Sequence, residues 1–325
     1  MSFELILPFF PEELRALLLD PSISDLMING ATGVYADRDG VVEHIALGTP
    51  YTNDRLQAAV ERVARILGQD LTSQNPILNT RLPDGSRVAV VGAPSSINGP
   101  TFTVRKFNRW FTSEELIHSG SLPEQVRNTV IGLIADRKNG IISGGTASGK
   151  TTLMKALLDH VPLHERLIVI EQPAELKITH PNAVRWEAVD AIPGQIAVSA
   201  SQLVAAALRH RPDRIIIGEI RDECGYDLLQ AMNTGHGGSL STIHAKSARD
   251  ALNRLSELAL SARPNLNHSF IRSETAEAID FVLYCERDPT GRRRVRELIA
   301  VNGYNCADES FETEELYRAS CPSAA

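Results

Sequence analysis

The sequence lacks the usual marks of membrane-spanning, disulfide-stabilised and zinc-stabilised proteins. No apolar run approaches the 18 residues expected of a membrane-spanning helix. The N-terminal segment has no basic region and is interrupted by prolines, so it does not resemble a secretory signal. The four cysteines are scattered without a C-x-x-C pair, which argues against a disulfide framework and a structural zinc module. We therefore expect four free thiols in a reducing compartment.

A basic surface large enough to hold duplex DNA is also missing. The formal net charge is −7, and the segments 1–110 and 111–325 carry −2 and −5 respectively. This balance argues against a protein bound to DNA mainly through phosphate contacts. The exception is a local basic run of Arg292, Arg293, Arg294 and Arg296, which we interpret as a solvated hairpin strand.

The composition is that of a folded globular protein. Hydrophobic residues make up 43% of the chain and charged residues 22%, which excludes a disordered or fibrous chain. A length of 325 residues favours two domains.

The first part of the sequence predicts a small α+β domain over residues 1–107. An amphipathic helix is expected at 54–67, where a glycine follows the last apolar residue. Short strands separated by turn residues predict an antiparallel sheet, with strands at 24–29, 33–37, 41–45, 87–91 and 101–107. The polar, turn-rich stretch 108–120 is predicted to be a linker containing a short helix at 113–118.

The remainder, 121–325, predicts an α/β domain with a mostly parallel sheet. After a helix at 123–138, strands and helices alternate, which is typical of βαβ units. The expected strands are 140–143, 166–171, 214–218 and 239–243, and the expected helices are 150–159, 201–210 and 223–233. The strand sequences LIVI and RIII lack polar alternation, as strands buried on both faces should.

A phosphate-binding motif follows the first of these strands. Residues 144–151 fit G-x-x-x-x-G-K-[ST] in full, between an apolar strand and a helix. Backbone N–H groups and the helix N-terminus would hold phosphate oxygens, Lys150 would reach the β- and γ-phosphates, and Thr151 would ligate Mg²⁺. The predicted nucleotide-binding residues are Gly144, Gly145, Thr146, Ala147, Ser148, Gly149, Lys150, Thr151 and Thr152.

Acidic residues end the two neighbouring strands. Glu219 follows the strand RIIIG, and Glu171 ends LIVI with Glu175 four residues later. Because parallel strands direct their C-termini to the ligand edge, Glu219 is expected near the γ-phosphate, where it could activate water and support Mg²⁺. Glu171 or Glu175 could polarise water or hold a metal-bound water, or either could be a surface carboxylate.

Two histidines occur eight residues apart in the segment TGHGGSLSTIHA. No third ligand has a spacing suited to zinc, so His236 and His244 are interpreted as polar sensors near the γ-phosphate. Glycines would let the loop approach a ligand, and the strand is expected to end at the same edge. Ordinary core or surface histidines are the alternative.

Together, these segments resemble the secretion (traffic) ATPases of type II secretion, type IV pili and type IV secretion. The blocks GGTASGKTT, LIVIEQPAEL, GEIR and TGHGGSLSTIHA, preceded by RLPDGSRV and TFTVRKF, occur in the family's order over about Ile23–Val301. The resemblance implies a RecA-like P-loop core, an N-terminal domain and a hexameric ATPase using ATP and Mg²⁺. It further implies a cytoplasmic location peripheral to the inner membrane and work with inner-membrane secretion or pilus-assembly proteins.

The resemblance also implies roles for individual residues. Glu219 corresponds to the catalytic glutamate and a possible water-mediated Mg²⁺ ligand, and Arg221 follows it in GEIR. Glu171 and Glu175 fall in the acidic box, and His236 and His244 in the histidine box. Arg87 and Arg105 lie in blocks that supply arginines to the nucleotide pocket, where they would stabilise transition-state charge. Solvated charges on a sheet face are the alternative for both arginines.

One difference from the family's sequence pattern and the absence of an extra module bear on the exact function. The acidic box commonly has an acid after its first glutamate, where this chain has Gln172. The missing tetracysteine module and the opening ISDLMINGATGVYADRDG favour conjugal-transfer ATPases of the TrbB kind, with tight-adherence pilus-assembly ATPases as the near alternative. We predict a motor for conjugative transfer or pilus assembly. A nucleotide-gated assembly platform with weak hydrolysis is a second hypothesis, and a DNA-pumping motor is a weaker third.

Overall fold

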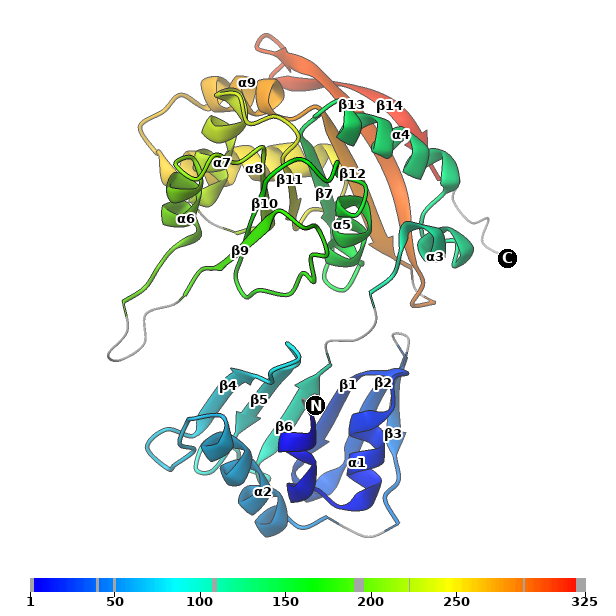
Figure 1. Cartoon of the computed structure of the whole chain (residues 1–325), viewed down its shortest axis with the longest axis vertical. Helices are drawn as coiled ribbons and strands as arrows, with labels where there is room; N and C mark the ends of the chain where they lie inside the picture. Colours follow the sequence, from blue (N-terminus) through cyan, green and yellow to red (C-terminus); the bar gives the residue numbers. More distant parts are fainter. Residues whose placement is uncertain are drawn as a thin grey trace. The chain divides into compact units, whose positions relative to one another are not determined.

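The computed structural model divides the chain into two compact units, Met1–Arg109 and Trp110–Ala325. It describes residues 3–38, 41–48, 51–106, 110–189, 196–221, 223–288 and 290–319. Each unit has its own sheet and its own helices (Figure 1). The two units are therefore described separately.

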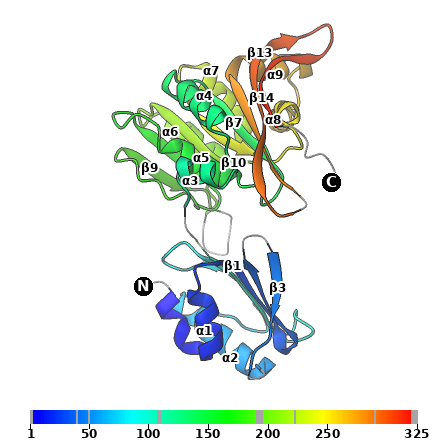
Figure 2. The ribbon, with the colours of Figure 1, turned by 90° about the vertical axis from the view of Figure 1, so that its right-hand side faces the viewer.

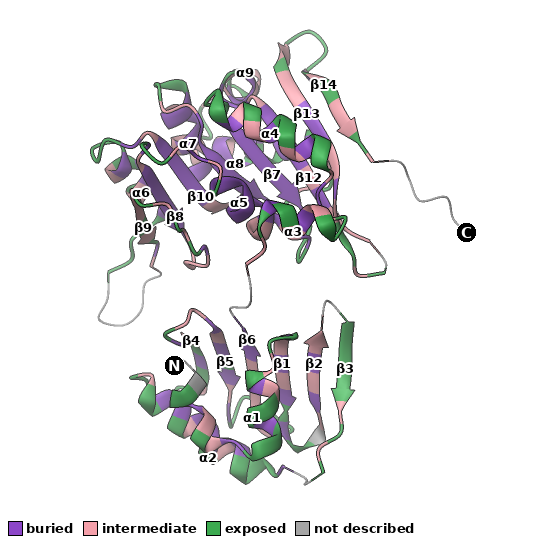
Figure 3. Ribbon diagram, turned by 45° about the vertical axis from the view of Figure 1, so that its right-hand side comes forward, coloured by how far each residue is buried: buried purple, intermediate pink, exposed green. Residues whose placement is uncertain are grey.

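The first unit is an antiparallel sheet covered on one face by helices. Its strand order is β3-β2-β1-β6-β5-β4, and every pairing is antiparallel. The strands are β1 (Ile23–Asn29), β2 (Val34–Arg38), β3 (Val41–Ile45), β4 (Ile77–Arg81), β5 (Arg87–Val91) and β6 (Thr101–Arg105). Helices α1 (Glu12–Leu19) and α2 (Asn53–Ile66) lie over the sheet (Figure 3).

Amphipathic patterning accounts for this packing. In β1, Leu26 and Ile28 are buried while the residues between them are less so, as expected of a strand with one face on the core. In α2, Leu56, Val60 and Val63 are buried on one face, and the Thr52 side chain caps the helix by accepting from the Arg55 N–H. The expected α+β fold of this part is confirmed, with β4 as a strand that the sequence did not predict.

The second unit is a mixed, mostly parallel sheet. Its strand order is β14-β13-β12-β7-β11-β10-β8-β9, in which the strands from β12 to β9 are parallel, and β13 pairs antiparallel with both β12 and β14. The strands are β7 (Gly140–Gly144), β8 (Leu167–Glu171), β9 (Ala183–Glu187), β10 (Arg214–Ile220), β11 (Leu240–Ile243), β12 (Phe281–Arg287), β13 (Arg293–Asn305) and β14 (Ser310–Arg318). The predicted α/β class is confirmed.

Helices cover both faces of this sheet (Figure 2). The helices are α3 (Ser113–His118), α4 (Glu124–Ala135), α5 (Lys150–Leu158), α6 (Ala200–Ala207), α7 (Cys224–Asn233), α8 (Ala248–Ala262) and α9 (His268–Ala278). Neighbouring strand residues enter different cores: Ile215 and Ile217 pack with α6 to α9, whereas Ile216 packs with α4 and α5. Burial on both faces explains the uninterrupted apolar sequence of the central strands.

Most of the expected linker belongs to the second unit. Thr112 and Glu115 form a capping box that starts α3, Leu116 is buried in the core beside α4 and α5, and the Ser113 hydroxyl lies 2.9 Å from His160 Nε2. The division between units falls at Arg109 and Trp110, and residues 107–109 lie outside the described ranges. Two of the polar residues that favoured a linker, Thr112 and Ser119, are the caps of α3.

Candidate functional site

The loop between β7 and α5 has the backbone of a phosphate cradle. A Cβ on Gly144 would lie 2.3 Å from the Cys285 carbonyl oxygen and 2.5 Å from the Ser148 hydroxyl, so this position accepts only glycine. Gly149 has a φ of +93° and caps α5, a conformation that other residues rarely adopt. The two glycines let the chain turn directly from the strand into a helix whose N-terminus faces the loop.

Lys150 lies folded against this loop. Its Nζ donates to the carbonyl oxygens of Gly144, at 3.0 Å, and Gly145, at 2.9 Å, and the side chain is buried. Burial lowers the pKa of Lys150, and the nearby Glu219 carboxylate opposes that shift. A cation held by two neutral carbonyl groups is poorly compensated, which favours the arrival of an anion at this position.

The loop residues fit a polyphosphate group. The buried Ser148 hydroxyl has no hydrogen-bond partner among the described residues, and the space beside Gly145 is open. Thr151 and Thr152 lie half-buried in the first turn of α5, directly after Lys150. N–H groups, an ammonium and hydroxyl groups form the donor set that phosphate oxygens require.

Glu219 lies at the C-terminal end of β10, between a guanidinium and an imidazole. Its Oε2 accepts from Arg221 Nη2 at 2.6 Å, and its Oε1 lies 2.9 Å from His244 Nε2. β10 pairs with β11 and β11 with β7, all in parallel, so Glu219, His244 and the phosphate loop share one edge of the sheet. Glu219, Arg221, His244 and Arg254 line a cleft of about 280 Å³.

The surroundings of His244 favour a neutral ring. Desolvation lowers its pKa from the ordinary value of 6.5, the charge of Lys150 adds to that effect, and the Glu219 carboxylate opposes it. A neutral imidazole beside Glu219 can donate through one nitrogen and accept through the other.

The Glu171 side chain is hydrogen-bonded to other residues of the acidic box, which is the segment 171–176. Its Oε1 accepts from the N–H groups of Glu175, at 2.6 Å, and Leu176, at 2.8 Å, and its Oε2 lies 3.3 Å from Arg185 Nη2. The side chain is buried, so these bonds hold the turn that follows β8. Glu171 and Gln172 also line a small pocket with Glu219 and Arg221, and Glu175 is half-buried nearby in the chain.

The expectation that both histidines lie at the phosphate edge is wrong for His236. β11 has four residues and runs parallel to β7, with Leu240 opposite Gly140 and Ile243 opposite Ser143. The two histidines therefore flank the strand at opposite ends, and only His244 follows its C-terminal end. A strand of this length separates the two sheet edges by about 13 Å.

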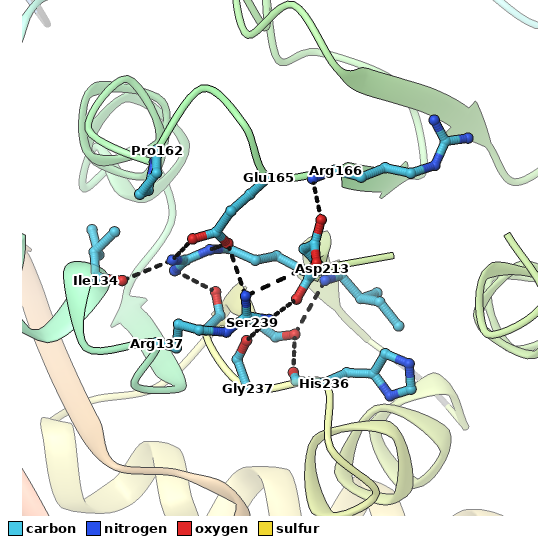
Figure 4. A network of polar contacts seen from close by, with 12 residues as sticks. Ile134, Arg137, Pro162, Glu165, Arg166, Asp213, His236, Gly237 and Ser239 are labelled. Carbon is cyan, nitrogen blue, oxygen red and sulfur yellow. Dashed lines mark hydrogen bonds and ion pairs between the residues drawn. The ribbon is translucent and has the colours of Figure 1, made fainter. Parts of the chain in front are cut away.

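A buried polar network holds the His236 loop at the other edge (Figure 4). Ser239 Oγ donates to the His236 carbonyl oxygen at 3.0 Å, and the His236 ring Nδ1 lies 3.2 Å from the Ala231 carbonyl oxygen. Arg214, which is fully buried, makes two bonds to Glu165, at 2.6 and 2.9 Å, and donates to the Gly238 carbonyl oxygen. His236 thus belongs to a structural network of the second unit.

The two predicted pocket arginines are in the first unit. Arg87 of β5 lies opposite Arg105 of β6, and Arg105 Nε is 2.7 Å from Asp25 Oδ1. Both lie on strands, as expected from their sequence blocks, and their action on a nucleotide stays a prediction.

Two basic residues near the loop and the acidic box were not predicted to act there. Arg293, at the start of β13, donates through Nε to the Ala147 carbonyl oxygen at 3.1 Å, and Arg185 of β9 contacts Glu171. The basic run at 292–296 was the sequence signal for Arg293, but the pairing that brings it to the loop is long-range.

In the described ranges, no group of three or more His, Cys, Asp or Glu residues could hold a metal ion. No helix in those ranges is long and apolar enough to cross a membrane.

Comparison with known proteins identifies the family. The model of the type II/IV secretion system protein family matches residues 12–306. The chain belongs to this family. It is 32% identical over 309 residues to the probable conjugal transfer protein TrbB of Sinorhizobium fredii (strain NBRC 101917 / NGR234), covering 94% of this chain and 91% of that protein.

Other relatives agree with this assignment. The type IV secretion system protein VirB11 of Bartonella quintana (strain Toulouse) is 31% identical over 326 residues, covering 88% of this chain and 90% of that protein. The X-ray structure of the Legionella pneumophila ATPase DotB has the same fold, with a TM-score of 0.64 at 20% identity, covering 89% of this chain and 80% of that one. The resemblance to secretion ATPases of the conjugal-transfer kind is confirmed.

Proposed function

We propose that this secretion ATPase family member is a Mg²⁺-dependent ATPase that powers conjugative transfer or type IV secretion. The observation that carries the proposal is the meeting of a phosphate cradle, Lys150, Glu219 and His244 at one sheet edge. Similarity to TrbB and VirB11 over most of the chain supports the biological setting.

In this proposal, the loop and Lys150 bind the β- and γ-phosphates. Lys150 leaves the carbonyl oxygens of Gly144 and Gly145 for phosphate oxygens, which replaces a neutral partner by an anion. Thr151 and Glu219 would hold Mg²⁺, Glu219 through water, and the ion would neutralise charge on the phosphates.

Glu219 is proposed to orient the attacking water. Arg221 and His244 hold its two oxygens, so the carboxylate is fixed before the nucleotide binds. Because Nε2–H of the neutral His244 ring donates to Glu219, the remaining ring nitrogen, Nδ1, is an acceptor and can receive a hydrogen bond from the attacking water. Glu171 acts by positioning the acidic-box turn that contains Glu175.

The working form is proposed to be a homo-hexamer in the cytoplasm, attached to the inner membrane through secretion or pilus-assembly proteins. Arg87 and Arg105 would act on a bound nucleotide as positive charges that stabilise the transition state. The acidic overall balance gives no support to tight nucleic-acid binding.

The test uses two variants with exposed controls. Lys150→Ala should lose ATP binding and ATPase activity, and Glu219→Gln should bind ATP but release phosphate at least about 100-fold more slowly. Lys177→Ala and Glu277→Gln make the same side-chain changes at exposed positions and should keep full activity. Wild-type turnover by both site variants would refute the ATPase proposal.

Gln172 favours a second candidate, a nucleotide-gated platform with weak hydrolysis. It lines the pocket beside Glu171 and Glu219, where the family commonly has an acid. The platform predicts that ring assembly, measured by light scattering, is complete with a non-hydrolysable ATP analogue while wild-type phosphate release is very slow. The motor predicts rapid wild-type release, and Gln172→Asp distinguishes the two further, because only the platform gains turnover when the acid is restored.

A further inference from the structure

The hairpin formed by β12 and β13 borders the phosphate loop on the flank away from Glu219. β12 pairs in parallel with β7, and Cys285 lies opposite Gly144 at the point where the loop begins. β11 and β10 lie on the other side of β7 and carry His244 and Glu219 at their C-terminal ends. The loop therefore has an acidic, water-activating flank and an opposite flank made by the hairpin.

Arg293 extends from this hairpin to the outer rim of the loop. Its Nε donates to the Ala147 carbonyl oxygen at 3.1 Å. A Cβ on Gly149 would lie 3.4 Å from Arg293 Cδ, so the glycine leaves room for the arginine stem. In the described part of the chain, the structure gives the Nη groups of this exposed guanidinium no hydrogen-bond partner.

The order of groups in a nucleotide determines which part would meet Arg293. If the γ-phosphate faces Glu219 and the β-phosphate occupies the cradle, the nucleoside must leave the loop away from β10 and β11. The hairpin is on that side, and Arg293 is its basic residue in contact with the loop. An exposed guanidinium plane with free Nη groups can stack on a purine ring.

We propose that Arg293 binds the nucleoside end of the nucleotide, with its guanidinium plane against the purine base. This inference rests on the proposed nucleotide-binding function. It assigns a ligand to one member of the basic run, whereas Arg296 is already paired with Glu286 at 2.7 Å. The Nε bond to Ala147 fixes the stem, so that binding has less side-chain entropy to overcome.

The test compares a nucleotide with a ligand that has no nucleoside. Affinities for ADP and for inorganic tripolyphosphate are measured by calorimetry on the full chain, for wild type, Arg293→Ala and the adjacent control Arg292→Ala. We expect Arg293→Ala to weaken ADP binding about tenfold and to leave tripolyphosphate binding unchanged. Arg292, exposed and with no side-chain hydrogen bond to a described residue, should tolerate the same loss of charge.

The other outcomes overturn the inference in distinct ways. Equal weakening of both ligands would mean that Arg293 only shapes the loop or contacts phosphate, and unchanged ADP binding would mean that it makes no contact with ligand. Arg293→Lys keeps the positive charge without the plane, so it should bind ADP as weakly as the alanine variant. Full recovery with lysine would exclude stacking, and a wild-type protein that binds neither ligand would refute the proposed function itself.

Discussion

The buried pair of Arg214 and Glu165 gives the sharpest stability prediction. The Arg214 side chain is 0% exposed and donates to both Glu165 oxygens. It also donates to the carbonyl oxygens of Ile134 and Gly238, which joins α4 to the His236 loop. Replacing Arg214 by methionine keeps the apolar stem and removes all of these donors at once.

The expected loss follows from what remains behind. Glu165 would stay buried with a weaker cationic neighbour, Arg137, which is 3.5 Å away and 41% exposed, while the Asp213 carboxylate opposes the Glu165 charge. Removing one partner of a buried ion pair costs about 3–5 kcal/mol. For a unit of this size, that corresponds to a fall of about 10 °C in the unfolding midpoint.

Tryptophan fluorescence can follow the unfolding of the second unit alone. Both tryptophans, Trp110 and Trp186, lie in that unit, so intrinsic fluorescence reports its unfolding. Arg209→Met, at an exposed position, is the control and should change stability by less than about 0.5 kcal/mol. The expected loss in the free energy of unfolding is about 3–5 kcal/mol, so a value for Arg214→Met within about 1 kcal/mol of wild type would refute the reasoning.

The pH dependence provides a second check on the same pair. The hydrogen bonds from Arg214 lower the pKa of Glu165 below its ordinary value of 4.5. A carboxylate whose pKa is lower in the folded state stabilises the fold. This stabilisation is complete at pH values above the pKa of the unfolded chain, and it is lost as the pH falls through the pKa of the folded state. The stability difference between wild type and Arg214→Met should therefore narrow as the pH falls below about 4.5, and a constant difference would exclude this linkage.

Three further predictions concern the loop, a helix cap and a histidine. Gly144→Ala places a Cβ 2.3 Å from the Cys285 carbonyl oxygen and should abolish binding of a fluorescent nucleotide, whereas Gly132→Ala in α4, where nothing lies within 4 Å of the added Cβ, should bind normally. Thr112→Ala removes the capping box of α3 and should cost about 1 kcal/mol in thermal unfolding; an unchanged midpoint would contradict that role. Because the pKa of His244 is lowered from 6.5, wild-type ATPase activity should fall only below that pH, as the ring gains a proton. His244→Gln should remove this acid limb from the pH profile, and its persistence would exclude His244 as the cause.

Local sequence patterns predicted the central part of the second unit well. The glycine-rich turn, the apolar strands and the acids near the ends of β8 and β10 are all encoded within a few residues. β7, β8, β10 and β11 therefore occur where expected, and Glu219 lies at the predicted edge. Among the elements that were not predicted, β14 has a weak local signal, because its sequence SFETEELYR is polar and mostly exposed or half-buried, whereas the apolar β12 and the amphipathic α8 do carry local signals.

The placement of His236 shows why a short motif can mislead. TGHGGSLSTIHA is continuous in sequence, but four of its residues, Leu240–Ile243, form strand β11, which runs from one edge of the sheet to the other. The direction of that strand is set by pairing with β7, about 100 residues earlier, which no local pattern contains. A histidine before the strand and one after it must then lie at different edges.

The same long-range pairing explains how the phosphate loop is supported. On one side, β10 and β11 bring Glu219 and His244 to the edge; on the other, β12 places the Cys285 carbonyl oxygen against Gly144. The flank formed by β10 and β11 carries groups suited to the γ-phosphate, and the flank formed by the β12–β13 hairpin carries Arg293. A nucleotide that spans the loop must contact both flanks, so binding strength and hydrolysis should respond to different residues. Variants of the hairpin are therefore expected to change nucleotide affinity, and variants of β10 and β11 to change turnover.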